Sequence, residues 1–215
     1  MLTRTSRKGV LGLTVAAMLA VGGHAEAGIL AANSGAAIPA FTGSQVFTDN
    51  FFGFSVSATV DYAVFAPGAF NIAFPGQDPS GGADYVYAYQ IENITGINPA
   101  TPITQFTVGL DGDEPLGPVG FVSSVGLVDP NNAAYVGSGP PSVAWDFAGA
   151  GNIPVNSSSA VLIFTSAAAP EWDSATVHAD WANSHDLPSP LPEPASLALL
   201  VLGLGLAGSR QLRRV

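Results

Sequence analysis

Three carboxylates stand together in the segment Asp111-Gly112-Asp113-Glu114, directly after a stretch expected to be a strand. Calcium prefers clustered carboxylate and carbonyl oxygens as ligands. The segment lacks the spacing of an EF-hand loop, which needs further ligands and a glutamate at its twelfth position. We therefore interpret Asp111, Asp113 and Glu114 as a candidate calcium site, with a solvated acidic turn as the alternative, and we expect no other cofactor.

The histidines offer a second kind of chemistry. His178 and Asp180 are two residues apart in an expected strand and so share a face, and His185-Asp186 follows soon after, in the expected linker. Such groups can ligate a metal or transfer a proton, although polar residues on a strand face are usually only solvated. The sequence has no Gly-x-Ser-x-Gly motif and no cysteine. No catalytic residue is identified, and the protein is predicted not to be an enzyme.

Aromatic side chains are the third group with a chemical use, because an exposed ring can stack on a sugar. Tyr85, Tyr87 and Tyr89 alternate on one face of an expected strand, and the tryptophans are Trp145, Trp172 and Trp181. Alternating aromatics in a strand are more often part of a core. Trp172, in the expected loop "APEWDS", is the best candidate for sugar binding.

The elements that must position these residues are strands. Residues 52–64 alternate between apolar and small or polar side chains, the pattern of a long strand with one buried and one wet face. Gly, Pro, Asn and Asp clusters bound the further expected strands, which are Tyr85–Ile91, Ile103–Leu110, Phe121–Val128, Val143–Phe147, Ala160–Thr165 and Ala175–Trp181. Residues 28–40 are expected to form a loose lead-in or an edge strand. The sequence predicts an all-β domain, a β-sandwich of immunoglobulin-like or jelly-roll type.

Basic residues are confined to the two ends of the chain. No lysine or arginine occurs between Gly9 and Ser209, and the net charge is -10. The central domain therefore cannot form Lys or Arg salt bridges, and binding to nucleic acid or to anionic lipid is not expected, because both require cationic side chains.

The N-terminus has the order of a secretory signal. Arg4, Arg7 and Lys8 precede an apolar run at residues 10–22, and Ala25-Glu26-Ala27 is a small-x-small cleavage site. Cleavage is expected after Ala27. The alternative is a permanent anchor, but the run is shorter than the ~20 apolar residues that span a bilayer.

The C-terminus begins with Pro192-Glu193-Pro194, continues with an apolar run at residues 195–207 and ends with three arginines, Arg210, Arg213 and Arg214. Each proline disfavours α conformation in the residue before it, so the tripeptide is expected to be extended and accessible to a protease. Arginines after the apolar run would stay on the cytoplasmic side. An ordinary tail anchor is the alternative.

These C-terminal residues resemble the PEP-CTERM sorting signal of Gram-negative bacteria. The resemblance implies that an inner-membrane exosortase recognises Pro192, Glu193 and Pro194 and processes the tail, and that Arg210, Arg213 and Arg214 act as the cytoplasmic stop. The interrupted basic cluster and the final Val215 depart from the pattern. The middle of the chain also resembles the uncharacterised ectodomains that precede this tail, at "YVYAYQIEN", "ITQFTVGL" and "SSSAVLIFTS".

The expected organisation is a signal peptide at 1–27, a β-sandwich ectodomain at 28–186, and a linker with the sorting signal at 187–215. The resemblance implies export, transient inner-membrane anchoring, and release to the cell surface or the extracellular matrix, with a structural or adhesive role among exopolysaccharides in biofilms. Expected partners are the Sec translocon, signal peptidase and exosortase, with membrane contact through the terminal segments only. The alternatives are a polysaccharide-binding module that uses calcium or Trp172, and a secreted hydrolase.

Overall fold

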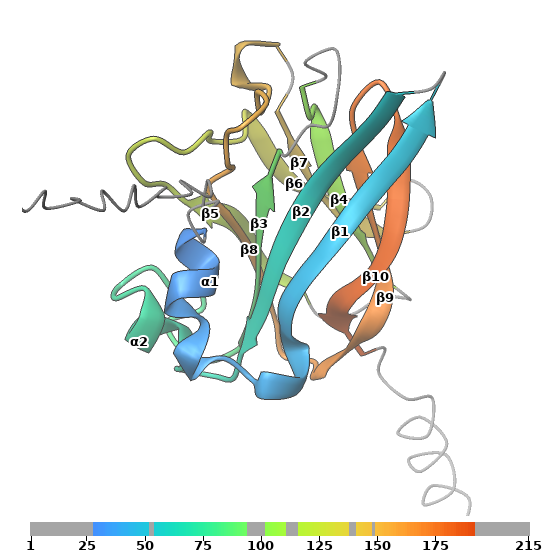
Figure 1. Cartoon of the computed structure of the whole chain (residues 1–215). Helices are drawn as coiled ribbons and strands as arrows, with labels where there is room; N and C mark the ends of the chain where they lie inside the picture. Colours follow the sequence, from blue (N-terminus) through green and yellow to red (C-terminus); the bar gives the residue numbers. More distant parts are fainter. Residues whose placement is uncertain are drawn as a thin grey trace, which may run out of the picture.

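The computed structural model describes residues 28–51, 54–93, 102–110, 116–137, 141–147 and 149–191, and its strands form two five-stranded sheets (Figure 1). Neighbouring strands in both sheets are antiparallel. The order in the first sheet is β1 (Thr42–Phe51), β2 (Phe54–Phe65), β3 (Tyr85–Glu92), β8 (Val161–Ser166), β5 (Leu116–Val122). The order in the second sheet is β10 (Ala182–Pro190), β9 (Pro170–His178), β4 (Gln105–Gly109), β7 (Ser142–Asp146), β6 (Asn132–Val136). The all-β prediction is confirmed.

Helical structure is short and lies mainly at the start of the domain. The two α-helices are α1 (Ile29–Asn33) and α2 (Phe70–Ala73), and the 3-10 turns are Ser34–Ala36, Pro39–Phe41 and Gly149–Gly151. Both α-helices lie on the same side of the first sheet (Figure 1). The expectation of a loose lead-in or an edge strand over residues 28–40 is therefore wrong, because this segment forms α1 and two 3-10 turns.

The strand boundaries differ from the expected ones in several places, and β6 (Asn132–Val136) forms where no strand was expected. The long strand expected at 52–64 is the second arm of a hairpin, since β1 ends at Phe51 and pairs with β2. The strand expected at Phe121–Val128 is β5, which ends at Val122. Strand β10 includes residues 187–190, which were expected to be linker; its Pro188 and Pro190 are tolerated because β10 lies at the edge of the sheet.

One apolar core lies between the two sheets. Tyr89 of β3 and Phe164 of β8 meet Trp145 of β7, with ring centroids about 6 Å apart, and Phe106 of β4 stacks on Trp145 at 5.8 Å. All four rings are buried, and the indole Nε1 of Trp145 donates to the carbonyl of Gly120 at 2.8 Å. The aromatic contacts join four strands, two from each sheet, into a single packed unit.

A second apolar cluster covers the opposite face of the first sheet. We call it the outer cluster; its buried members are Leu30, Ala63, Phe65, Phe70, Phe74, Val86, Ala88, Val161 and Ile163. Because α1 and α2 contribute Leu30 and Phe70, the first sheet is covered on both faces. This explains why β8 is buried at every position. The face of β2 that the alternation marked as wet lies under the N-terminal segment instead.

The folded domain extends beyond the boundary expected at residue 186. In β10, Leu187 and Ser189 are buried, and the hydroxyl of Tyr89 donates to the carbonyl of Pro188. The backbone N–H of Leu191 donates to the carbonyl of Ala169 at 2.7 Å. Residues 187–191 therefore belong to the domain and not to a linker.

Candidate functional site

Four polar side chains lie beside the outer cluster, on the same face of the first sheet. Ser44 of β1 is opposite Asp61 of β2, and Asp61 is opposite Gln90 of β3. Glu92 is two residues further along β3 and therefore lies on the same face. We call these four residues the polar row. Asp61 is only 6% exposed and Gln90 is fully buried, which is unusual for such side chains.

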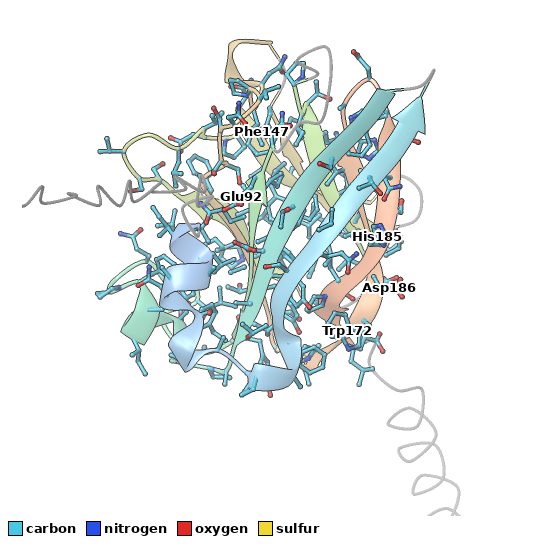
Figure 2. All side chains as sticks on the ribbon, in the orientation of Figure 1. Glu92, Phe147, Trp172, His185 and Asp186 are labelled. Atoms are coloured by element: carbon cyan, nitrogen blue, oxygen red, sulfur yellow. The ribbon has the colours of Figure 1, made fainter. Side chains whose placement is uncertain are left out.

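The start of the described domain lies against the polar row. The backbone N–H of Gly28 donates to the carboxylate of Glu92. The N–H of Leu30 donates to Oε1 of Gln90 at 2.9 Å, while Nε2 of Gln90 donates to the carbonyl of Ser159 at 2.9 Å. These bonds satisfy first-turn N–H groups of α1 that have no partner within the helix. Figure 2 shows Glu92 beside α1, apart from His185, Asp186 and Trp172.

Only glycine fits at position 28 without rearrangement. A Cβ atom there would lie 2.5 Å from Oε1 of Gln90 and 3.1 Å from Oε1 of Glu92. Gly28 is itself buried. The backbone of Gly28 therefore lies so close to the side chains of β3 that no room is left for a Cβ atom.

The electrostatics of the polar row are unfavourable for two charged carboxylates. Burial raises the pKa of Asp61, and the hydrogen bond from the Ser44 hydroxyl lowers it in part. The pKa of Glu92 is also raised, first by burial and then by the Asp61 carboxylate. The hydrogen bond from the N–H of Gly28 lowers this pKa in part. No lysine or arginine of the domain can neutralise the pair, because none occurs between residues 9 and 209.

Sequence reasoning missed the polar row. Asp61 falls on the face of the 52–64 alternation that was assigned to solvent, and a carboxylate there attracts no attention. The apolar residues Ala63 and Phe65 on that same face were the available signal, since they are buried and do not suit a wet surface.

Trp172 is half exposed, at 47%, and it is held by two other rings. Its ring lies 5.6 Å from that of Phe41 and 5.7 Å from that of Tyr62, with the Tyr62 contact edge-on. Trp172 belongs to β9 and Tyr62 to β2, so the cluster joins the two sheets at their margin. A fixed and partly exposed indole is suited to stacking on a flat apolar surface such as a sugar ring.

The other aromatic residues considered for sugar binding are structural. Tyr87 and Tyr89 are buried in the core, and Tyr87 stacks on Phe164 at 4.8 Å. Trp145 is buried as well, and Trp181 packs against the same core. Tyr85 is partly buried at the margin of this core.

The histidines do not come together. Strand β9 ends at His178, so Asp180 lies in the turn that follows rather than on the same strand. His178 is opposite Ala182 and His185 is opposite Ala175, which places the two rings on opposite faces of the sheet. The ring of His185 instead contacts Phe47 edge-on at 5.0 Å. Burial lowers the pKa of His178.

Several predicted residues lie outside the described ranges. These are the calcium candidates Asp111, Asp113 and Glu114, the cleavage residues Ala25 and Ala27, and the sorting residues Pro192, Glu193, Pro194, Arg210, Arg213 and Arg214. Within the described ranges, no three His, Asp or Glu side chains group closely enough to hold a metal ion. Among the helices of the described part, none is long and apolar enough to cross a membrane.

No protein-family model, no curated protein and no solved structure matches this chain. The resemblance to the PEP-CTERM tail therefore stays a prediction from the sequence. Two features of the described domain remain as candidate sites, namely the polar row under Gly28 and the aromatic cluster of Phe41, Tyr62 and Trp172.

Proposed function

We propose that the protein is an exported bacterial surface or extracellular-matrix protein, sorted through its PEP-CTERM signal, with a non-enzymatic structural or adhesive role. One observation supports this proposal above all. The points where processing is predicted adjoin the folded domain on both sides, at Gly28, which packs on Glu92, and at Leu191, which bonds to Ala169. Removal of both ends would leave the domain intact.

We further propose that the fold is a β-sandwich of jelly-roll type. The chain changes sheet at each of three successive connections, from β3 to β4, to β5 and to β6. An immunoglobulin domain, with its ABED and CFG sheets, does not change sheet three times in succession. A jelly roll, which builds two sheets from Greek-key connections, accommodates such repeated changes, and we therefore favour it.

The test is the intact mass of the protein recovered from its host, measured separately for cell-envelope and culture-medium fractions. Intact mass is the suitable method because trypsin has no lysine or arginine to cleave between residues 9 and 209. We expect a species that begins at Gly28 and ends near residues 192–194, with any additional mass reporting a modification. A species in the envelope that retains Val215 would contradict the sorting proposal.

The second candidate function is polysaccharide binding, favoured by the half-exposed ring of Trp172. Binding by Trp172 should not depend on calcium, whereas binding by Asp111, Asp113 and Glu114 should be lost with a chelator. A glycan array with calcium and with chelator distinguishes the two. Trp172→Ala should abolish calcium-independent binding, and silence of the wild-type protein in both conditions would reject this function.

A further inference from the structure

Within the described domain, the polar row has no lysine or arginine partner. The Asp61 carboxylate raises the pKa of Glu92, and the domain contains no lysine or arginine. A carboxylate pair beside an apolar cluster is costly unless a positive group compensates it. One positive group can be created by processing, which is the α-amino group that cleavage after Ala27 would leave on Gly28.

We propose that the polar row is the binding site for the protein's own mature amino terminus, whose α-ammonium group pairs with Glu92 after signal cleavage, while the neighbouring Asp61 adds to the negative potential there. The inference rests on the proposed export and on cleavage between Ala27 and Gly28. The nitrogen of Gly28 already donates to the Glu92 carboxylate as an amide. Cleavage converts that same nitrogen into an ammonium group, so the charge appears where the acceptors are already in place.

The local geometry suits an amino terminus. An ammonium group has three protons to donate, and Glu92 and Oε1 of Gln90 both lie within reach of position 28. A side chain at position 28 would displace Gln90, so the site takes glycine as the first residue. Gln90 is held by its bond to Ser159 and cannot move aside freely.

Capping of α1 explains part of the polar row. Gln90 and Glu92 accept backbone N–H groups at the start of α1, and both would do so in an uncleaved chain. Capping does not require Asp61. This carboxylate is buried and accepts its hydrogen bond from the hydroxyl of Ser44 in β1. The two readings differ in whether the amino group of the mature protein is bound.

Processing would then complete the outer layer of the first sheet. Before cleavage, the two carboxylates weaken the docking of the N-terminal segment over Phe65 and Ala63. After cleavage, the ion pair strengthens the same docking. The precursor would therefore be less stable than the mature domain, which is compatible with export of an unfolded chain and folding afterwards.

The sequence provides a direct probe. The only lysine of the chain is Lys8, so a protein that begins at Gly28 carries its α-amino group as its sole amine. Labelling with an amine-specific acylating reagent, followed by intact mass, thus reports on one group. We would label the exported protein at pH 8, natively and in guanidinium chloride.

We expect native labelling to be slower than labelling of the unfolded protein by roughly fivefold or more, because a one-unit rise in pKa from about 8 lowers the neutral amine fraction at pH 8 by that factor. Glu92→Gln should remove most of this protection, and Asp61→Asn should remove part of it. Asp180→Asn, which changes an exposed carboxylate in a turn, is the matched control and should label like wild type. Cooperative thermal unfolding verifies that each variant is folded.

Equal rates in the native and unfolded wild-type protein would overturn the inference. A folded Glu92→Gln variant that stays as protected as wild type would also overturn it. If this variant does not fold, the test rests on Asp61→Asn and on the ratio of native to unfolded labelling rates in the wild-type protein. The intact mass separates the two proposals. An exported species that begins elsewhere than Gly28 refutes both the predicted cleavage and this site, whereas a species that begins at Gly28 and labels without protection refutes the site alone.

Discussion

The two faces of the first sheet are covered in different ways. On the inner face, rings from both sheets pack together, and Tyr89, Trp145 and Phe164 are all buried. On the outer face, apolar packing around Phe65 ends at the polar row, where a buried Asp61 lies near Glu92. The buried residues of the inner face come almost entirely from strands, while the outer face depends on the N-terminal segment and α2.

This difference separates the residues that determine the fold from those that respond to processing. The inner face is covered by the second sheet. The outer face is completed by α1, which begins directly after the predicted cleavage point. Changes to the inner core should therefore destabilise the domain whatever its N-terminus, and changes to the polar row should matter most in the mature form.

The largest effect is expected from Trp145→Ala. This change removes a fully buried indole that contacts Tyr89, Phe106 and Phe164, and it should lower the free energy of unfolding by about 3–5 kcal/mol. Urea unfolding followed by circular dichroism measures the loss. Trp172→Ala is the matched control because Trp172 is half exposed, and it should cost about 1–2 kcal/mol at most. Equal losses would mean that the inner core is not the dominant support.

An intermediate effect is expected from Gly28→Ala. The added Cβ would meet Gln90 at 2.5 Å, and the displacement should cost about 1–3 kcal/mol. Gly35→Ala is the matched control, since nothing lies within 4 Å of its Cβ position, and it should change stability by less than about 1 kcal/mol in either direction. The comparison uses urea unfolding of exported proteins with verified N-termini. Identical stabilities for the two variants would refute close contact at Gly28.

The smallest effect is expected in the pH dependence of stability. With an acetylated nitrogen at Gly28, the pKa values of Asp61 and Glu92 are raised in the folded state. Stability is then highest below their ordinary pKa values and is lost as pH rises through the folded ones. A free ammonium group should cancel this loss between about pH 4 and 7, by about 1 kcal/mol, a modest value because Glu92 is partly exposed.

This prediction is checked by unfolding the exported protein with and without N-terminal acetylation across that pH range. Parallel curves for the two forms would contradict it.

His178 contributes equally to both forms. Its pKa is lowered by burial, so its contribution to stability is present above its ordinary pKa and is lost as pH falls through its folded-state pKa.

The sequence predicts the inner part of the fold better than its outer layer. Alternation identifies β2 and β3, and the run Ala160–Phe164 is apolar at every position, as a strand covered on both faces must be. Strand β1 was not identified because residues 42–51 are largely polar and small. Its pairing with β2 decides that it forms, and no local pattern reports such pairing.

The candidate site was less predictable than the fold. Trp172 was selected as a residue of an expected loop. That segment is instead the start of β9, although the Trp172 ring is half exposed. Asp61 and Glu92 could not be selected in this way, because their role depends on which segment covers the outer face. That cover is made by residues 28–41, whose short helix and turns carry no regular apolar period.

The most direct test of the account is the pKa of the α-amino group of the exported protein, obtained from the pH dependence of its acylation rate. An α-amino group ordinarily has a pKa of about 7.7–8.0. Pairing with Glu92, beside Asp61, favours the charged form. We therefore expect a pKa clearly above this range in the wild-type protein and a pKa within the range in Glu92→Gln. A value within or below the range in the folded wild-type protein would contradict the binding of the amino terminus to the polar row.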